Sequence, residues 1–282
     1  MTDNIPDLVS LVLTLRYVGK EDPERSLPRW WGKSAHALIL DLIRKASPEK
    51  ARKIHNSPSG PPPFTTSTLI GYQARKGFKA EKTYRLRLTA LNQDISRILL
   101  TTLEQNGGFA SGNKIELDYL PFRIEGADWE GEKHPWAGAS TYQQLGARWL
   151  SAEENPSRRI TFTFTSPTFF KSGGKHTAYP TPELVFHSLM LQWNTYGSIT
   201  FPEEVKRFAA ECLSVRRFQL SSRKVTLGRK MHRTGCVGKV SFVATHYDRY
   251  WLSVLHTLAA YALFAGIGKS TALGMGQARK GS

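Results

Sequence analysis

The sequence predicts an α+β protein of two tandem ferredoxin-like (RRM-like) domains, each with the element order βαββαβ. Its 282 residues, 40% of them hydrophobic, fit one large domain or two of ordinary size. The first half alternates strand and helix periodicity in this order, and the second half repeats the order without repeating the sequence. We therefore expect an N-terminal domain at 1–128 and a C-terminal domain at 129–282, divided within the loop-rich segment 125–140.

The first set of elements follows from apolar periodicity. Residues 8–17 are apolar and β-rich, which indicates a strand. From Trp31 onward apolar residues recur at helical spacing, and Ser47 with Pro48 opens a second short helix, with serine as cap and proline in the first turn. After a Pro-rich loop, the pattern gives in order strands at 64–72 and 83–91, a helix at 94–105 and a strand at 114–124.

The second set begins with the alternating stretch RITFTFTSPTFF (159–170), which indicates a strand. The pattern then gives in order a helix at 182–196, strands at 214–226 and 235–245, a helix at 248–264 and a last strand in the terminal stretch. Open sheets of this type bind single-stranded RNA on one face. Neither half carries the aromatic signature of an RRM, so the sheet need not be the binding face.

The charge balance points to a polyanionic partner. The chain has 39 Lys and Arg against 23 Asp and Glu, a formal net charge of +16. The basic residues are interleaved with glycine and aromatic residues at 75–88 and 220–240, where glutamates are almost absent. This pattern favours nucleic acid over an anionic membrane surface or a purely solvated basic face.

Several classes of function lack their motifs. The N-terminus has no signal-peptide pattern, no apolar run is long enough to span a membrane, and two cysteines make no disulfide framework, so we expect a cytoplasmic protein. H-E-x-x-H, C-x-x-C, a dense acidic cluster and G-x-S-x-G are all missing, so we expect no metal and no cofactor. Gly268-Lys269-Ser270 suggests a P-loop, but Leu263 stands where its first glycine is required.

Five stretches carry a family resemblance. They are PPPFTTSTLIG (61–71), preceded by a histidine at the end of a short helix, and TFTSPTFF, PTPELVFHSLMLQWN, TGCVGKVSF and GIGKSTALGMGQAR. With them the sequence resembles, over nearly its whole length, the CRISPR repeat-processing endoribonucleases of the RAMP (repeat-associated mysterious protein) superfamily.

The resemblance implies a function in CRISPR antiviral defence. Such proteins bind the repeat of a precursor transcript and cut it once per repeat without metal. The 2′-hydroxyl attacks the adjacent phosphate and leaves a 2′,3′-cyclic phosphate and a 5′-hydroxyl end. Other subunits of a CRISPR effector complex are candidate partners, and the protein is expected to be a monomer or a homodimer. The alternative is a non-catalytic RAMP subunit that only holds guide RNA.

Two of the eight histidines are candidates for the proton transfers that this reaction needs. The resemblance implies that His55 occupies the family's catalytic histidine position, and that His36 lies on the helix where several relatives place a histidine or tyrosine. The alternatives to a catalytic role are structural: His55 caps its helix, and His36 is a half-buried packing residue. If Ser34 caps the first helix, the dipole lowers the pKa of His36 and suits it to be the base, with His55 as the acid. Arg52 and Lys53 oppose the second assignment.

The candidate RNA-binding residues fall into three groups. Relatives carry a lysine just after the catalytic histidine; this chain has prolines there, so the cations Arg29, Lys33, Arg52 and Lys53 are candidates for its role. An expected hairpin is flanked by Arg229, Lys230 and Arg233. The terminal loop resembles the family's RNA-contacting loop and contributes Gly266, Gly268, Lys269, Gly274 and Gly276, whose glycines expose backbone N–H groups to phosphate unless they serve tight packing.

Overall fold

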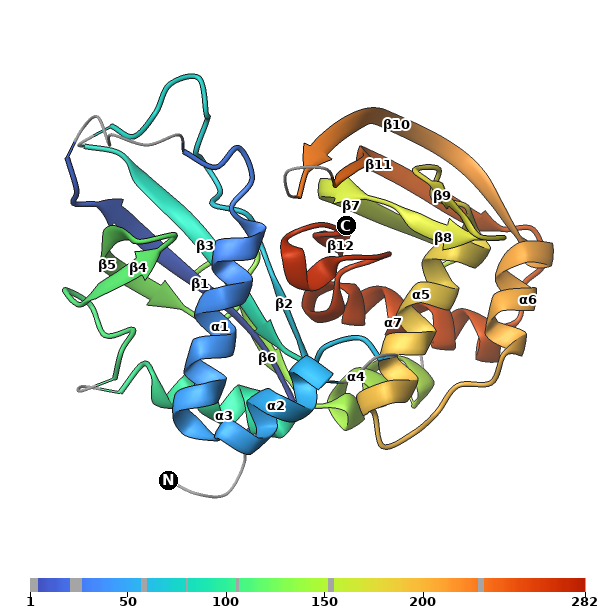
Figure 1. Cartoon of the computed structure of the whole chain (residues 1–282). Helices are drawn as coiled ribbons and strands as arrows, with labels where there is room; N and C mark the ends of the chain where they lie inside the picture. The colour runs from blue at the N-terminus through green and yellow to red at the C-terminus, as the bar shows by residue number, and fades with distance from the viewer. Residues whose placement is uncertain are drawn as a thin grey trace. The chain divides into compact units, whose positions relative to one another are not determined.

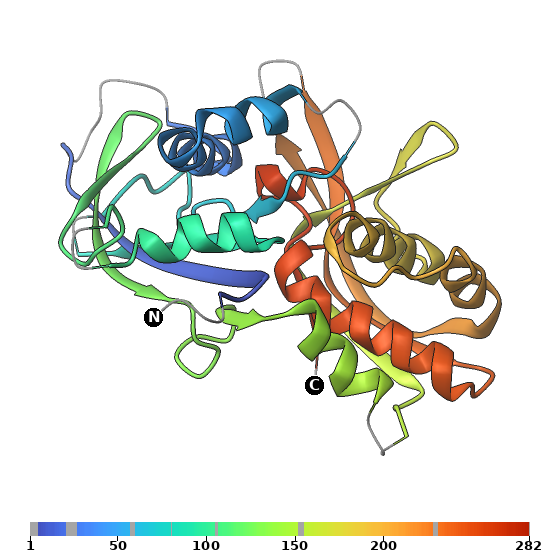
Figure 2. The same ribbon diagram turned by 90° about the horizontal axis from the view of Figure 1, so that it is seen from below.

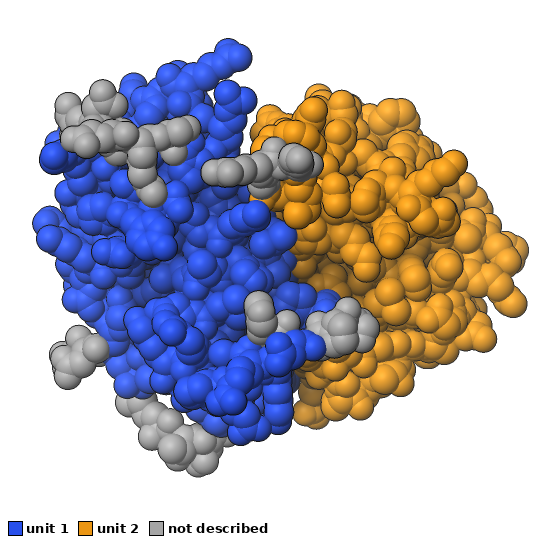
Figure 3. Space-filling view, viewed as in Figure 1, with its two compact units in different colours: residues 1–139, 272–274 blue, residues 140–271, 275–282 orange. Residues whose placement is uncertain are grey.

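The computed structural model describes residues 5–20, 27–56, 60–79, 81–104, 107–151, 155–227 and 231–281, with the side chain of His55 left out. The chain forms two compact units (Figure 3). Unit 1 contains Met1–Ala139 and Ala272–Gly274, and unit 2 contains Ser140–Thr271 and Met275–Ser282. Three residues of the glycine-rich terminal stretch therefore belong to unit 1.

Unit 1 is a sheet with helices packed against it (Figure 1). Its strand order is β2-β3-β1-β5-β4, with β6 also paired to β1. The strands are β1 Leu8–Tyr17, β2 Phe64–Thr66, β3 Thr83–Ala90, β4 Lys114–Leu117, β5 Leu120–Asp128 and β6 Gly138–Ser140. The helices are α1 Gly32–Ala46, α2 Pro48–Asn56 and α3 Gln93–Thr101, and α1 and α3 lie on the same side of β1 (Figure 2).

The core of unit 1 follows from alternation along β1. Leu11, Leu13 and Leu15 are fully buried in a cluster that also contains Ile39 and Ile43 of α1. The opposite side of the same strand carries Ser10, whose hydroxyl donates to the Trp136 carbonyl oxygen at 2.6 Å. Segment 129–139 thus packs within unit 1, and the two units divide at 139/140, inside the loop-rich segment 125–140 but after the expected end of the N-terminal domain at 128.

Other departures in unit 1 have local causes. The expected strand at 114–124 is a hairpin, because Asp118 and Tyr119 both adopt positive φ (53° and 61°) between β4 and β5. The expected strand at 64–72 ends at Thr66, and only an isolated bridge joins Ile70 to Arg85. Helix α1 begins at Gly32 with Trp31 as N-cap, so Ser34 is not the cap.

Unit 2 has the sheet order β10-β11-β7-β12. The strands are β7 Arg159–Thr168, β10 Leu213–Thr226, β11 His232–Ala244 and β12 Ala278–Lys280, and a separate hairpin pairs β8 Phe170–Ser172 with β9 Lys175–Thr177. The helices are α4 Tyr142–Leu150, α5 Pro182–Tyr196, α6 Glu204–Cys212 and α7 Arg249–Ala265. A short 3₁₀ turn, η1 Thr271–Leu273, follows α7; of its residues only Thr271 belongs to unit 2. Alternation along β7 buries Phe162 and Phe164, and Phe162 packs on Phe186 of α5.

The predicted α5 is confirmed at both ends, and its first residue is the helix-initiating Pro182. Helices α4 and α6 were not predicted. Helix α4 begins with a capping box in which Thr141 and Gln144 satisfy each other's backbone N–H groups, a helix-start signal that follows directly after the predicted loop-rich segment 125–140. In the described part of the chain, no helix is both long and apolar enough to cross a membrane.

Candidate functional site

His36 lies on α1, where it is half-buried. Its Nδ1 is 3.1 Å from the carbonyl oxygen of Ala272, and its ring is 5.3 Å from the ring of Phe64. A carbonyl oxygen can only accept, so Nδ1–H donates in this hydrogen bond. In the neutral ring the lone pair is then on Nε2, which makes Nε2 the nitrogen able to take up a proton.

The acceptor of this bond is held in unit 1 by several contacts. The Thr66 hydroxyl also donates to the Ala272 oxygen at 2.9 Å, and Trp30 Nε1–H donates to the next carbonyl, that of Leu273, at 2.7 Å. A Cβ on Gly32 would overlap the Leu273 carbonyl, so a side chain at the first residue of α1 would push this segment away. The segment 272–274 is thus a fixed part of unit 1, and it orients the His36 ring.

Gly274 ends this segment in the left-handed region, with φ 86°. A Cβ there would lie 2.8 Å from the backbone nitrogen of Thr68 and 3.2 Å from the Trp30 ring. Both the conformation and the close approach require glycine. Packing within unit 1 is therefore sufficient reason for this residue.

The other three glycines of the loop lie in unit 2 and also have positive φ: Gly266 (64°), Gly268 (86°) and Gly276 (68°). Their surroundings are protein. The Gly268 N–H donates to Ser188 Oγ at 2.8 Å, the Lys269 N–H to the Phe169 oxygen at 2.9 Å, and the Gly276 N–H to the Pro167 oxygen at 3.0 Å. The N–H groups of Gly268, Lys269 and Gly276 are thus used within unit 2, and RNA contact by this loop stays a prediction. Lys269 also has an exposed side chain.

The second candidate histidine, His55, is the penultimate residue of α2, and its side chain lies outside the described part of the structure. Arg52 and Lys53 are exposed on the same helix, and Lys53 Nζ pairs with Glu49 at 3.0 Å. Arg29 and Lys33 are exposed around the start of α1. Ser47 Oγ accepts from the Lys50 N–H at 3.4 Å, as expected of the cap of α2.

The predicted hairpin is formed by β10 and β11, which pair from Leu213 with Ala244 to Thr226 with His232. Arg233 is half-buried there, and its guanidinium donates to the His232 oxygen at 2.8 Å. Arg229 and Lys230 lie outside the described residues. Of this group, the structure therefore places Arg233 alone.

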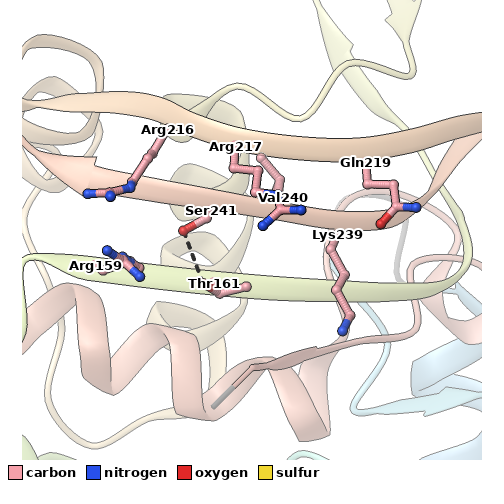
Figure 4. A pocket seen from close by; sticks show the side chains of 8 residues that line it. All are labelled: Arg159, Thr161, Arg216, Arg217, Gln219, Lys239, Val240 and Ser241. Atoms are coloured by element: carbon pink, nitrogen blue, oxygen red, sulfur yellow. Dashed lines mark hydrogen bonds between the residues drawn. The ribbon is translucent and has the colours of Figure 1, made fainter.

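A basic hollow of about 600 Å³, which the residue-level predictions missed, lies on the sheet of unit 2 (Figure 4). We define the hollow by its lining residues Arg159, Thr161, Arg216, Arg217, Gln219, Lys239, Val240 and Ser241. Alternation in the predicted strand at 159–170 could have shown which of its residues face away from the core, because Arg159 and Thr161 alternate with the buried Ile160 and Phe162. The basic signal had been assigned to the loop of the hairpin instead of to its strands.

Two observations complete the description. Among the described residues, no group of three or more His, Cys, Asp or Glu side chains could hold a metal ion.

Burial, with help from the cations Lys206 and Lys269, lowers the pKa of His187 on α5. That ring is therefore mainly neutral near pH 7.

Comparison with known sequences supports the resemblance. The family described as CRISPR-associated endoribonuclease Cas6 matches residues 162–278. Two curated Mycobacterium tuberculosis proteins of that description, from two strains, are each 28% identical over 128 residues, which is 44% of this chain. The matched segment spans 39% of the length of these curated relatives.

Solved structures match over almost the full length. A Cas6 product complex, of a protein also solved as Thermus thermophilus Cas6, is 27% identical with a TM-score of 0.78, covering 97% of this chain and 99% of that one. A second Cas6 product complex is 28% identical with a TM-score of 0.75, covering 98% and 99%. That second protein has also been solved as a histidine-to-alanine mutant.

Proposed function

We propose, from the confirmed resemblance to the CRISPR repeat-processing endoribonucleases of the RAMP superfamily, that this chain cuts CRISPR repeat RNA in precursor transcripts to make guide RNAs. The net charge of +16 and the basic hollow fit a polyanionic substrate. We also propose that both units are ferredoxin-like domains. In support, the strand orders β2-β3-β1-β5 and β10-β11-β7-β12 place equivalent strands of the two βαββαβ sets in the same positions.

The observation that carries the proposal is the hydrogen bond from His36 Nδ1–H to the Ala272 oxygen. It leaves Nε2 basic and fixes the orientation of the ring. In the reaction, Nε2 removes the proton of the 2′-hydroxyl and the 2′-oxygen bonds to the adjacent phosphorus. The bond from phosphorus to the 5′-oxygen breaks, and an acid protonates that oxygen. The products are a 2′,3′-cyclic phosphate and a 5′-hydroxyl end.

The role of base for His36 now depends on this hydrogen bond and not on the helix dipole. Since α1 begins at Gly32, His36 is its fifth residue, beyond the first turn in which the dipole acts strongly. We keep His55, near the end of α2, as the proposed acid. The exposed Arg29, Lys33, Arg52 and Lys53 are the candidates for the cation that stabilises the phosphorane.

The test uses a transcript of the repeat from the host's own CRISPR array, incubated with the protein in EDTA. We expect one cut per repeat, with ends that map as cyclic phosphate and 5′-hydroxyl. A substrate with a 2′-deoxy nucleotide on the 5′ side of the cut should bind and stay intact. Normal cutting of this deoxy substrate would refute attack by the 2′-oxygen. Tight binding without any cutting would instead support the non-catalytic guide-RNA-binding subunit.

A further inference from the structure

The basic hollow gathers four cations on the open face of the sheet of unit 2 (Figure 4). Arg216 and Arg217 come from β10, Lys239 from β11 and Arg159 from β7, and all four are exposed. The pairing register makes these strands neighbours, since Gln219 pairs with Lys239 and Val243 with Arg159. The positive charge is therefore concentrated by the fold and not by sequence proximity.

Nothing in the described chain neutralises this charge. No acidic residue lines the hollow, and within the described ranges none of the four cations forms an ion pair. Elsewhere, the exposed cations Lys45 and Lys53 pair with carboxylates, as does the half-buried Lys50. Like charges on neighbouring strands repel one another, so the arrangement is destabilising until an anion occupies it.

The remaining lining residues provide hydrogen-bonding groups. Thr161 donates its hydroxyl to Ser241 Oγ at 3.1 Å, which leaves the Ser241 hydroxyl proton to donate to an incoming oxygen. Gln219 adds an amide beside Lys239. Aromatic side chains are missing from the lining, so bases have no surface on which to stack.

We propose that the basic hollow is a second RNA site, which holds the sugar-phosphate backbone of single-stranded RNA outside the bond that is cut. Its binding is independent of base identity, because the lining offers cations and hydroxyls but no stacking surface. The proposal relies on the proposed function only for the choice of RNA as the polyanion. The hollow contributes affinity, and the chemistry belongs to His36 in unit 1.

The test compares two double variants that remove the same charge. The first variant, Arg217→Ala with Lys239→Ala, removes two of the four cations that line the hollow. Lys206→Ala with Arg207→Ala removes two exposed cations from α6, which packs on α5 and α7. Binding of a uridine homopolymer and of the 2′-deoxy repeat RNA is measured at several salt concentrations, so that no step depends on cutting.

In the hollow variant we expect roughly tenfold weaker binding at physiological salt. The slope of log K against log salt should be shallower by about 1.4, since each lost phosphate contact on a single strand contributes about 0.7. The α6 variant should match the wild type, and cytidine and uridine homopolymers should bind alike. The charge-conserving Arg217→Lys with Lys239→Arg should keep the wild-type slope, which controls for local misfolding.

Three results would overturn the proposal: an unchanged slope in the hollow variant, an equal loss in the α6 variant, or a tenfold preference for one base. The outcome is separable from that of the proposed function. At subsaturating protein the hollow variant should lose cutting only in proportion to its loss of binding, whereas the α6 variant should cut as the wild type does. If the wild type binds but never cuts, the proposed function fails while the result for the hollow still stands.

Discussion

The two sheets share a strand order but differ in the face that is turned away from their main core. In unit 1 that face bears Arg87, which is 1% exposed, and the guanidinium lies 5.0 Å from the centre of the Trp136 ring. In unit 2 it bears the exposed cations of the basic hollow, and none of the described residues that line the hollow is aromatic.

Positive charge thus occurs in two settings: buried beneath an aromatic ring in unit 1 and exposed on the sheet in unit 2. Burial lowers the pKa of Arg87 to about 9, and its guanidinium also bonds Ser10 Oγ at 3.3 Å, so this cation helps to close a face. Arg217 and Lys239 are exposed and line the basic hollow. A basic residue on a sheet is thus informative about ligands only when its cover is known.

The largest effect is expected from changing the chemistry of unit 1. His36→Ala should lower single-turnover cleavage about 1,000-fold, since general base catalysis contributes about 10² to 10⁴. Binding of the 2′-deoxy repeat should not change. If the variant instead binds RNA more weakly and cleaves at an unchanged rate, His36 acts in RNA binding, as proposed for the hollow of unit 2. The proposed separation of catalysis in unit 1 from binding in unit 2 would then be wrong.

A substrate with sulfur in place of the bridging 5′-oxygen extends this test. A thiolate leaves without an acid, so this substrate should rescue His55→Ala but not His36→Ala. Rescue of His36→Ala alone would exchange the two roles.

An effect of intermediate size, on the free energy of unfolding, is expected from removing the Trp136 side chain that covers Arg87 in unit 1. Trp136 is half-buried, and Trp136→Ala should lower the free energy of unfolding by about 2–3 kcal/mol, through lost burial and a lost cation–π contact. Arg217→Ala, on the open face of unit 2, should change it by less than about 0.5 kcal/mol. Urea unfolding of both variants measures the contrast, and equal destabilisation would remove the distinction between covered and uncovered cations.

The sequence predicted the regular elements well where one periodicity dominates. The bounds of β1 and α5 are confirmed because alternation in one and helical spacing in the other run unbroken to a turn. The turn between β4 and β5 was missed because Asp118 and Tyr119 adopt positive φ without a glycine or asparagine to signal it.

The candidate site was only partly predictable. His36 could be chosen from its place on a helix, but its partner Ala272 is 236 positions away and contributes a backbone oxygen, which no side-chain pattern reveals. The glycines of the terminal loop were read as ligand-facing, whereas close backbone packing such as that at Gly268 accounts for them. The hollow depends on strand register, which alternation within single strands does not fix.

The smallest effect concerns the pH dependence of stability that comes from His256, a buried histidine in unit 2. His256 of α7 stacks on Trp149 of α4, with ring centroids 4.6 Å apart, and its Nε2–H donates to the Ser157 oxygen at 2.8 Å. Burial chiefly, with the cation Lys280 adding to it and the Ser157 bond opposing it, lowers the pKa of His256 to about 4. The unfolded chain, with an ordinary histidine pKa, therefore binds more protons between about pH 6.5 and 4, so stability falls as the pH drops through this window.

We expect the wild type to lose about 1–2 kcal/mol more than His256→Phe between pH 7 and 5, as linkage requires of one such group. Protonation would also leave a buried Nδ1–H, since Nδ1 has no hydrogen-bond partner among the described residues. Phenylalanine can keep the stack on Trp149 but cannot titrate, so urea unfolding at the two pH values isolates the proton. If the two proteins lose stability in parallel, the pKa of His256 is the same in the folded and the unfolded chain, and its cover by Trp149 does not keep the ring neutral. A smaller loss in the wild type than in His256→Phe would mean that the folded protein holds this histidine protonated, as Arg87 is held charged beneath Trp136.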